Sequence, residues 1–216
     1  MIITIDGPAG AGKSTAAKLL AQRLGFDYLD TGAMYRAVTL AALRGQMDLN
    51  DQAILGRLLD TLHLELPAGR VLLNGEDVTG LIRAPQITSA SGPIASSPAV
   101  RQRLVDWQRR IAAGRDIVCE GRDQGTVVFP HAECKFFLVA DPAERARRRL
   151  RDLQMRGESA TFDEVLAAQE IRDARDAARD IGPMVPAADA IRLDSTSWTI
   201  EEMVARMERE IRSRRF

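Results

Sequence analysis

The stretch Gly7-Pro8-Ala9-Gly10-Ala11-Gly12-Lys13-Ser14 matches the pattern G-x-x-x-x-G-K-[ST], and Thr15 follows it. A strand-like run, Ile2 to Ile5, precedes the stretch, and an amphipathic helical pattern follows it. In this setting glycines let backbone N–H groups surround phosphate oxygens at a helix N-terminus, Lys13 reaches the β and γ phosphates, and the Ser14 hydroxyl ligates magnesium. The sequence therefore predicts a nucleoside triphosphate site in a phosphate-binding loop, or P-loop.

Motifs elsewhere in the chain argue against two classes of P-loop protein. A regulatory GTPase reads guanine with Asn-Lys-x-Asp, but the only asparagines, Asn50 and Asn74, are followed by Asp and Gly. A motor or transporter ATPase carries an apolar strand that ends in Asp, whereas the nearest run here ends in Glu120. The Glu120 carboxylate could still hold a magnesium-bound water. The sequence thus argues against a GTPase and gives an ATPase motor little support.

Short apolar runs rich in β-branched or aromatic residues alternate with helical patterns along the chain. Buried strands in such an order predict an α/β fold with a mainly parallel sheet. The predicted strands are Ile2 to Ile5, Asp27 to Leu29, Asp116 to Cys119, Lys135 to Val139 and Ala190 to Leu193. Helix starts are marked by a capping residue three positions before an acid. These pairs are Asp141 with Glu144, Thr161 with Glu164 and Thr199 with Glu202.

One segment interrupts this alternation. Residues 52–62 have a helical pattern, and Leu64 to Val78 holds two short alternating runs around the turn signals Pro67-Ala68-Gly69 and Asn74-Gly75. A small antiparallel element is expected there. We therefore interpret residues 48–97 as an inserted subdomain.

Composition and charge are typical of one globular domain of 216 residues, with 45% hydrophobic and 28% charged residues. The 30 basic and 30 acidic residues cancel, which argues against a general attraction to nucleic acid or a membrane surface. Cys119 and Cys134 lack neighbours at ligand spacing, so no zinc site is expected. No targeting or membrane-spanning segment is predicted either, and a cytoplasmic protein is the expectation.

Charged residues continue an apolar face on the helix that begins at Phe162. The face runs on through Arg172, Asp176 and Arg179, which predicts a polar cleft where the arginines meet phosphate and Asp176 meets a hydroxyl. Exposed, salt-bridged helix charges are the alternative.

Two other arginines show the same conflict with the apolar pattern. Arg101 faces inward on a helix over residues 100–111, and Arg36 lies among apolar residues in 32–43. A buried arginine needs either an internal carboxylate or an anion site, and the pattern leaves both open for Arg36.

Two further stretches hold candidate site residues. Arg122 and Asp123 follow the strand that ends near Cys119, at the edge where parallel strands open toward a ligand, although a structural turn is also possible. Arginines crowd the next stretch, at Arg145, Arg147, Arg148, Arg149, Arg151 and Arg156. That stretch predicts either a mobile lid that brings arginines to a transferred phosphoryl group or a basic face that contacts RNA.

Several stretches together resemble the bacterial cytidylate kinases, a family of nucleoside monophosphate kinases. They are Ile3 to Pro8, Leu29 to Arg36, Glu120 to Asp123, Gly125 to Pro130 and Val185 to Ala190. The resemblance implies a P-loop kinase fold with a five-stranded parallel sheet flanked by helices. It also implies a core over residues 1–47, 98–150 and 180–216, a monophosphate-binding insert over 48–97 and a lid over 151–162.

The resemblance further implies roles for residues at matching positions. Catalytic roles fall to Lys13, Arg122 and Arg179. ATP would be bound by Gly7, Pro8, Ala9, Gly10, Ala11, Gly12, Lys13, Ser14, Thr15 and Arg148, with Ser14 on Mg²⁺. CMP would be bound by Thr31, Tyr35, Arg36, Arg101, Arg122, Asp123, Arg172 and Asp176. The chain departs from the family at Glu120, where Asp is usual, and at Gly92, where a base-contacting Ser is usual.

The reaction implied is transfer of the γ-phosphoryl group of ATP to CMP or dCMP, with Mg²⁺ as cofactor, in pyrimidine nucleotide metabolism. It requires two nucleotides held in line and the developing charge neutralised, and no covalent chemistry from the protein. A monomer with no nucleic-acid or membrane partner is expected. The alternatives are a kinase of another acceptor, such as UMP, AMP or a sugar acid, and an ATP-binding regulator that contacts RNA.

Overall fold

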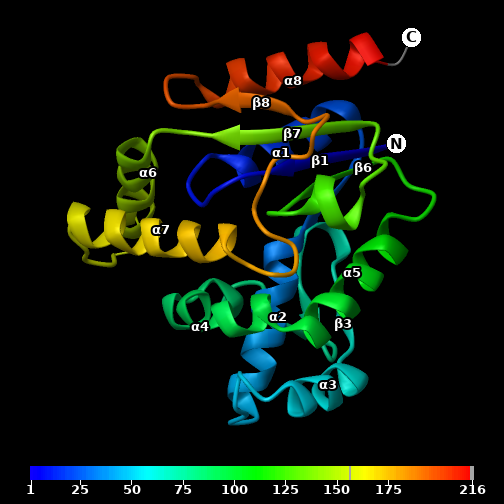
Figure 1. Cartoon of the computed structure of the whole chain (residues 1–216), viewed down its shortest axis with the longest axis vertical. Coiled ribbons are helices and arrows are strands. Elements are labelled where there is room, and N and C mark those ends of the chain that lie inside the picture. The colour runs from blue at the N-terminus through cyan, green and yellow to red at the C-terminus, as the bar shows by residue number, and fades with distance from the viewer. Residues whose placement is uncertain (156, 215–216) are drawn as a thin grey trace. The chain divides into compact units, whose positions relative to one another are not determined.

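A computed structural model describes residues 1–155 and 157–214 (Figure 1). Its internal contacts divide the chain into two compact units. The first, called the P-loop unit, comprises Met1–Asp27 with Arg115–Phe216, and the second, called the middle unit, comprises Tyr28–Gly114.

A five-stranded sheet has the strand order β2-β6-β1-β7-β8. Its strands are β1 (Ile2–Asp6), β2 (Asp27–Asp30), β6 (Ile117–Glu120), β7 (Cys134–Val139) and β8 (Ile191–Asp194). β1 pairs in parallel with both β6 and β7, which places Thr4 opposite Cys119 and Lys135. All five predicted strands are confirmed to within one residue at each end. The reason is that the three central strands are short, apolar and almost wholly buried.

Four long helices belong to the P-loop unit. They are α1 (Lys13–Leu24), α6 (Pro142–Met155), α7 (Phe162–Ala177) and α8 (Ile200–Arg214). α1 packs against β6 and α8, while α6 and α7 pack against each other, as Figure 1 shows. The predicted capping residues are confirmed: Thr161 and Glu164 form a capping box at α7, and Thr199 and Glu202 make the same reciprocal bonds before α8.

The middle unit combines four helices with a small antiparallel sheet. The helices are α2 (Thr31–Arg44), α3 (Gln52–Thr61), α4 (Pro85–Ser96) and α5 (Pro98–Ala112). The sheet has the order β3-β4-β5, from β3 (Leu64–Glu65), β4 (Leu72–Leu73) and β5 (Glu76–Asp77), with 3-10 turns η1 (Pro67–Gly69) and η2 (Leu81–Arg83). Asn74 and Gly75 both adopt positive φ at the β4–β5 turn. The antiparallel element predicted from those turn residues is therefore confirmed.

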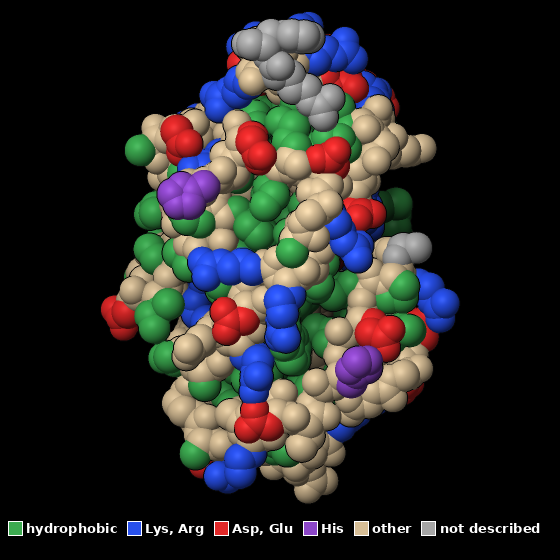
Figure 2. Space-filling model, turned by 90° about the vertical axis from the view of Figure 1, so that its right-hand side faces the viewer, with side chains coloured by type: hydrophobic (Ala, Val, Ile, Leu, Met, Phe, Trp, Pro, Cys, Tyr) green, Lys and Arg blue, Asp and Glu red, His purple; other side chains and the backbone are tan. Residues whose placement is uncertain are grey.

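Two features of the chain concern reactivity and surface. Cys119 in β6 and Cys134 in β7 are buried and free, and burial raises the pKa of both thiols, that of Cys134 to about 11. Basic and acidic side chains are intermixed on the face that Figure 2 shows, in keeping with the balanced charge. In the part of the chain that is described, no helix is both long and apolar enough to cross a bilayer.

Candidate functional site

The P-loop occupies the turn between β1 and α1. Gly7 adopts a φ of 136°, and a Cβ there would lie 2.0 Å from the carbonyl oxygen of Leu138 in β7. Only glycine fits so close to the neighbouring strand. The loop therefore runs directly from the central strand to the N-terminus of α1, as the sequence pattern predicts, with Ser14 and Thr15 exposed on the first helical turn.

Lys13 is buried beside this loop, with an exposed fraction of 6%. Its Nζ donates a hydrogen bond to the carbonyl oxygen of Pro8 at 2.7 Å. Burial and the nearby Arg122 charge together lower the pKa of Lys13 to about 7, although the Glu120 carboxylate opposes them. A buried ammonium group with this little compensating charge favours an anionic ligand such as a polyphosphate.

Arginines surround the carboxylate of Asp176 on α7, which is 3% exposed. Nε of Arg122 donates to Oδ2 at 3.0 Å, Arg179 forms an ion pair with Oδ1, and Nε of Arg172 lies 4.0 Å from Oδ2. Burial would raise the pKa of Asp176, but Arg122, Arg179 and Arg172 hold it below its ordinary value. Positive charge exceeds negative charge in this cluster, so it too favours an anion.

The turn after β6 is a single π-helical turn, η3 (Gln124–Val128). The sequence predicts a glycine-containing turn here but not its form. Asp123, which precedes it, is 4% exposed, and its carbonyl oxygen accepts the N–H groups of Val127 and Val128 at 2.9 and 3.3 Å. Arg122 and Asp123 are thus held by the backbone of this turn, next to the end of a central strand.

The base of the α6–α7 pair contacts the P-loop through Arg145. Its side chain is 7% exposed, donates to the carbonyl oxygen of Ala9 at 3.1 Å and forms an ion pair with Asp173 of α7. Gln169 of α7 donates to the carbonyl oxygen of Arg145 at 3.3 Å. A Cβ on Gly10 would lie 3.0 Å from Cβ of Arg145, so loop and helix are closely packed. Arg145 is therefore a buried, paired residue of this contact.

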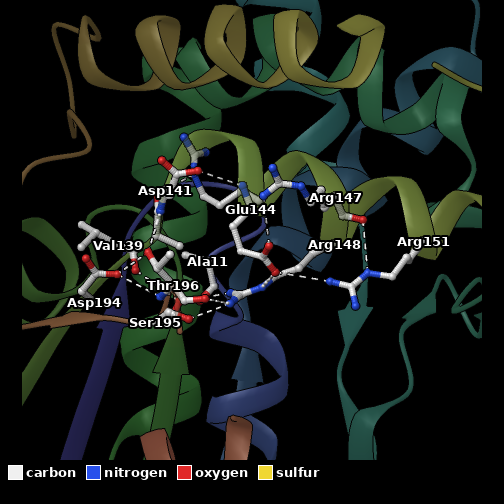
Figure 3. Close-up of polar contacts among 12 residues, drawn as sticks. Ala11, Val139, Asp141, Glu144, Arg147, Arg148, Arg151, Asp194, Ser195 and Thr196 are labelled. Carbon is white, nitrogen blue, oxygen red and sulfur yellow. Dashed lines mark hydrogen bonds and ion pairs between the residues drawn. The ribbon is translucent and has the colours of Figure 1, made fainter. Parts of the chain in front are cut away.

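Arg148, the next candidate on α6, points toward the loop between β8 and α8 (Figure 3). It donates to the carbonyl oxygen of Ser195 at 2.6 Å and to that of Thr196 at 3.2 Å, and its Nε pairs with Glu144. Ser195 Oγ in turn donates to the carbonyl oxygen of Ala11 at 3.0 Å. Ser195 thus links Arg148 to the P-loop.

The middle unit brings together a second set of candidates. Thr31 is 2% exposed at the start of α2, where Asp30 caps the helix by accepting the N–H of Ala33 at 2.8 Å. Arg36 pairs with Asp30 at 3.2 Å, so it has the internal carboxylate that the pattern left open. Its Nε is buried without a hydrogen-bond partner among the described residues, which leaves a donor for a ligand.

Arg101 of α5 faces inward, as the helical period predicts, and is 2% exposed. Its guanidinium lies 5.9 Å from the ring centre of Tyr35 on α2 and donates to the carbonyl oxygen of Ala95 at 3.2 Å. Gly92 is buried in α4, and the neighbouring Ser91 donates its hydroxyl to the carbonyl oxygen of Thr88 at 2.8 Å. That hydroxyl is engaged within its own helix.

Comparison with known proteins adds to this geometry. A family model described as cytidylate kinase matches residues 3–213. The chain belongs to the cytidylate kinase family. A protein named cytidylate kinase from Rhodopirellula baltica is 48% identical over 213 residues, which cover 97% of this chain and 93% of the relative. Another from Pelotomaculum thermopropionicum is 51% identical over 207 residues, which cover 94% and 92%.

The fold of this cytidylate kinase family member is similar to that of solved structures. A shikimate kinase from Bacteroides thetaiotaomicron superimposes with a TM-score of 0.51 at 16% sequence identity, and the match covers 98% of each chain. A likeness at this identity concerns the fold. It agrees with a parallel five-stranded sheet flanked by helices in a P-loop kinase.

Sequence reasoning overlooked three residues that build the site of this cytidylate kinase family member. They are Asp6, Asp173 and Ser195, each buried or paired against the P-loop, the turn after β6 or Arg145. Asp6 carries a usable signal, because a carboxylate at the buried end of a strand requires donors. Ser195 carries none, since a lone serine in a loop has no distinguishing pattern.

Proposed function

We propose that the chain transfers the γ-phosphoryl group of ATP to CMP or dCMP, giving ADP and CDP or dCDP. The observation that carries this proposal is the family match over residues 3–213 in a chain whose P-loop holds a buried Lys13. The two relatives named above support the same activity, because they are 48% and 51% identical over nearly the whole chain.

ATP would be the ligand of the P-loop. The amide groups of residues 7–15 would surround its phosphates, and Lys13 would exchange its bond to Pro8 for the β and γ phosphates. The phosphate charge would raise the pKa of Lys13 again and so favour its charged form. Arg148 would bind ATP from α6, close to Ser195.

Mg²⁺ is implied by the family's nucleotide chemistry, and the residues present fit it. The described residues hold no group of three or more acidic, His or Cys side chains that could bind a metal. Mg²⁺ bound to nucleotide phosphates needs only one or two protein groups, and Ser14 is exposed on the first turn of α1 to supply one. When bound, Mg²⁺ would neutralise phosphate charge and orient the donor.

The candidate residues for CMP form two sets, one in each unit. In the middle unit, Arg36 would meet the acceptor phosphate with its unpaired Nε, beside Thr31, and Arg101 with Tyr35 would contact the base. In the P-loop unit, Asp123 would contact the base, and the side chains around Asp176 would reach ribose and phosphate, with Arg172 and Asp176 on the ribose.

Phosphoryl transfer would then depend on position and charge. Arg122 and Arg179 share one carboxylate, Asp176, so their combined charge is only partly neutralised. Guanidinium groups fixed in advance can stabilise the charge on the transferred group without reorganisation. No general base is required, because the acceptor phosphate is largely a dianion near neutral pH.

We also propose that residues 48–97 form the monophosphate-binding insert and residues 151–162 the lid. The first lies within the compact middle unit. In the second, α6 extends to Met155 and α7 begins at Phe162, while residue 156 lies outside the described part of the chain. The substrates favour a cytoplasmic enzyme, and since every candidate residue comes from one chain, a monomer would suffice. Cell fractionation and sedimentation test these two proposals.

The test of the function is ADP release with Mg-ATP and a panel of acceptors: CMP, dCMP, UMP, AMP and none. Turnover confined to CMP and dCMP is the expected result. Turnover with UMP or AMP instead would keep the kinase and discard the cytosine site. Gly92, where the family usually has a base-contacting Ser, would then be the first position to restore. ADP release that is independent of any acceptor would contradict the proposed transfer.

A further inference from the structure

Asp6 is the last residue of β1 and directly precedes the P-loop. It is 4% exposed. Its Oδ1 accepts the backbone N–H of Gln124 at 2.9 Å, and its Oδ2 accepts that of Gly125 at 2.8 Å, 118 and 119 positions along the chain. One side chain therefore connects the strand that leads into the P-loop with the turn that carries Arg122 and Asp123.

Close packing leaves this turn little room to move. A Cβ on Gly125 would approach Oγ1 of Thr4 to 3.0 Å and Oδ2 of Asp6 to 3.4 Å. Glycine is needed here so that the backbone can reach the carboxylate. Because the turn is π-helical and held at its first two N–H groups, its position depends on the acceptor it finds on β1.

A carboxylate suits these two donors, and an amide does not. Both oxygens of an ionised aspartate accept hydrogen bonds, whereas asparagine presents one oxygen and one NH₂ group. In asparagine, therefore, one backbone N–H would face another donor and remain buried without a partner. Protonation of Asp6 has the same effect, since one oxygen becomes a donor.

Charged and titratable groups lie on every element next to Asp6. They are Lys13 of α1, Asp123 of the turn, Cys119 and Glu120 of β6, and Lys135 of β7, which pairs with Asp189. Burial and the charge of Asp123 raise the pKa of Asp6, and the N–H groups of Gly125 and Gln124 and the charge of Lys13 lower it, so that its pKa is about 6. The carboxylate is therefore largely ionised at neutral pH.

We propose that Asp6 is a positioning residue for phosphoryl transfer. It holds the Gln124–Gly125 backbone against β1 and thereby sets where Arg122 and Asp123 lie relative to Lys13. Asp6 acts through these neighbours and does not touch a substrate. The proposal rests on the proposed function, since it assigns the turn to the reaction of the same site.

The test compares Asp6→Asn with Thr4→Val in the full-length protein. Thr4 is the matched control because it lies on the same face of β1, contacts the same glycine position and has a buried Oγ1 with no hydrogen-bond partner among the described residues. Asp6→Asn should lower kcat/KM for CMP phosphorylation about 10- to 100-fold, since small displacements of catalytic groups cost that much. Thr4→Val should leave kcat/KM unchanged.

A pH profile separates positioning from general destabilisation. The ratio of kcat/KM for Asp6→Asn to that of the wild type should rise as the pH falls through about 6, because the wild-type residue then also carries a proton. Ionisation of the acceptor phosphate affects both enzymes and cancels in the ratio. In the wild type, the amide proton resonances of Gln124 and Gly125 should titrate over the same range, which provides a readout even where the variant does not fold.

Several results would overturn the proposal. They are a fully active Asp6→Asn variant, an equal loss in Thr4→Val, a ratio that does not change with pH, or wild-type amide resonances that do not titrate. Absence of CMP turnover by the wild type in the same assay would instead contradict the proposed function. Normal turnover by both the wild type and Asp6→Asn would contradict only the positioning role.

Discussion

Arg122 and Asp176 form a partly buried ion pair, with Nε 3.0 Å from Oδ2, although 54 positions of sequence separate them. Arg179 binds the other oxygen of the same carboxylate. Two guanidinium groups therefore share one negative charge within the P-loop unit. This arrangement fixes cations in place before any ligand arrives and leaves part of their charge for that ligand.

Asp176→Asn should destabilise the protein at neutral pH by about 2 kcal/mol, because two charge-assisted hydrogen bonds weaken. Folding lowers the pKa of Asp176. Its carboxylate therefore stabilises the folded protein fully above pH 3.8, the ordinary pKa, and this stabilisation is lost as the pH falls through the folded-state pKa. The difference in urea midpoint between wild type and variant should therefore narrow below that pH. A difference that stays constant in acid would contradict the ion-pair account.

Lys13→Met should stabilise the nucleotide-free protein and abolish phosphoryl transfer. Folding lowers the pKa of Lys13 from 10.5 to about 7. The buried charge therefore destabilises the folded protein fully below pH 7, and this loss of stability disappears as the pH rises toward 10.5. The gain in Tm should be a few degrees near pH 6 and smaller near pH 9, while kcat/KM falls by roughly 10³ or more. The control is Lys18→Met, an exposed change on the same helix, which should alter neither Tm nor kcat/KM. Substantial residual turnover in Lys13→Met would refute the role of Lys13 in binding the phosphoryl donor.

Arg101→Ala should raise KM for CMP about tenfold or more and leave KM for ATP within about twofold, since its guanidinium is buried against Tyr35 in the middle unit. Arg103→Ala is the matched control. Arg103 lies on the same helix but is 40% exposed and pairs with Asp60. Initial-rate kinetics with each substrate varied measure the effect. Equal losses for CMP and ATP would argue against a place for Arg101 in the acceptor site.

Arg145→Met should cost about 3 kcal/mol of stability, because it leaves the largely buried Asp173 carboxylate without its cation. Adding Asp173→Asn should recover part of that loss, which a double-mutant cycle in urea measures. KM for ATP should rise in Arg145→Met, since the carbonyl oxygen of Ala9 within the P-loop loses its donor. Strictly additive effects of the two changes would show that the pair contributes nothing beyond its separate residues.

Much of this fold could be predicted because its signals are local. Thr161 and Glu164 lie three positions apart and form the capping box that this spacing predicts. The inward direction of Arg101 follows from the helical period alone. The five strands follow from apolar runs that the sheet buries.

The rest could not be predicted because its partners are distant in sequence. Asp6 finds its donors in a turn more than a hundred positions away, and no periodicity links the two. Arg145 belongs to an arginine-rich stretch that predicts a mobile lid or an RNA-contacting face, yet its side chain is 7% exposed because Asp173 on another helix neutralises it. Composition shows how many arginines this stretch contains, but only the packing of α6 on α7 shows that Arg145 is buried.

Cys119 and Cys134 lie in β6 and β7, the two strands that flank the central β1. Their thiols are buried and their raised pKa values leave almost no thiolate in the folded protein at neutral pH. An alkylating reagent can therefore react only when the sheet opens, so the rate of labelling measures the free energy of that opening. Nucleotides that bind the folded chain should slow the labelling. The labelling rate of these two cysteines therefore also reports ligand binding.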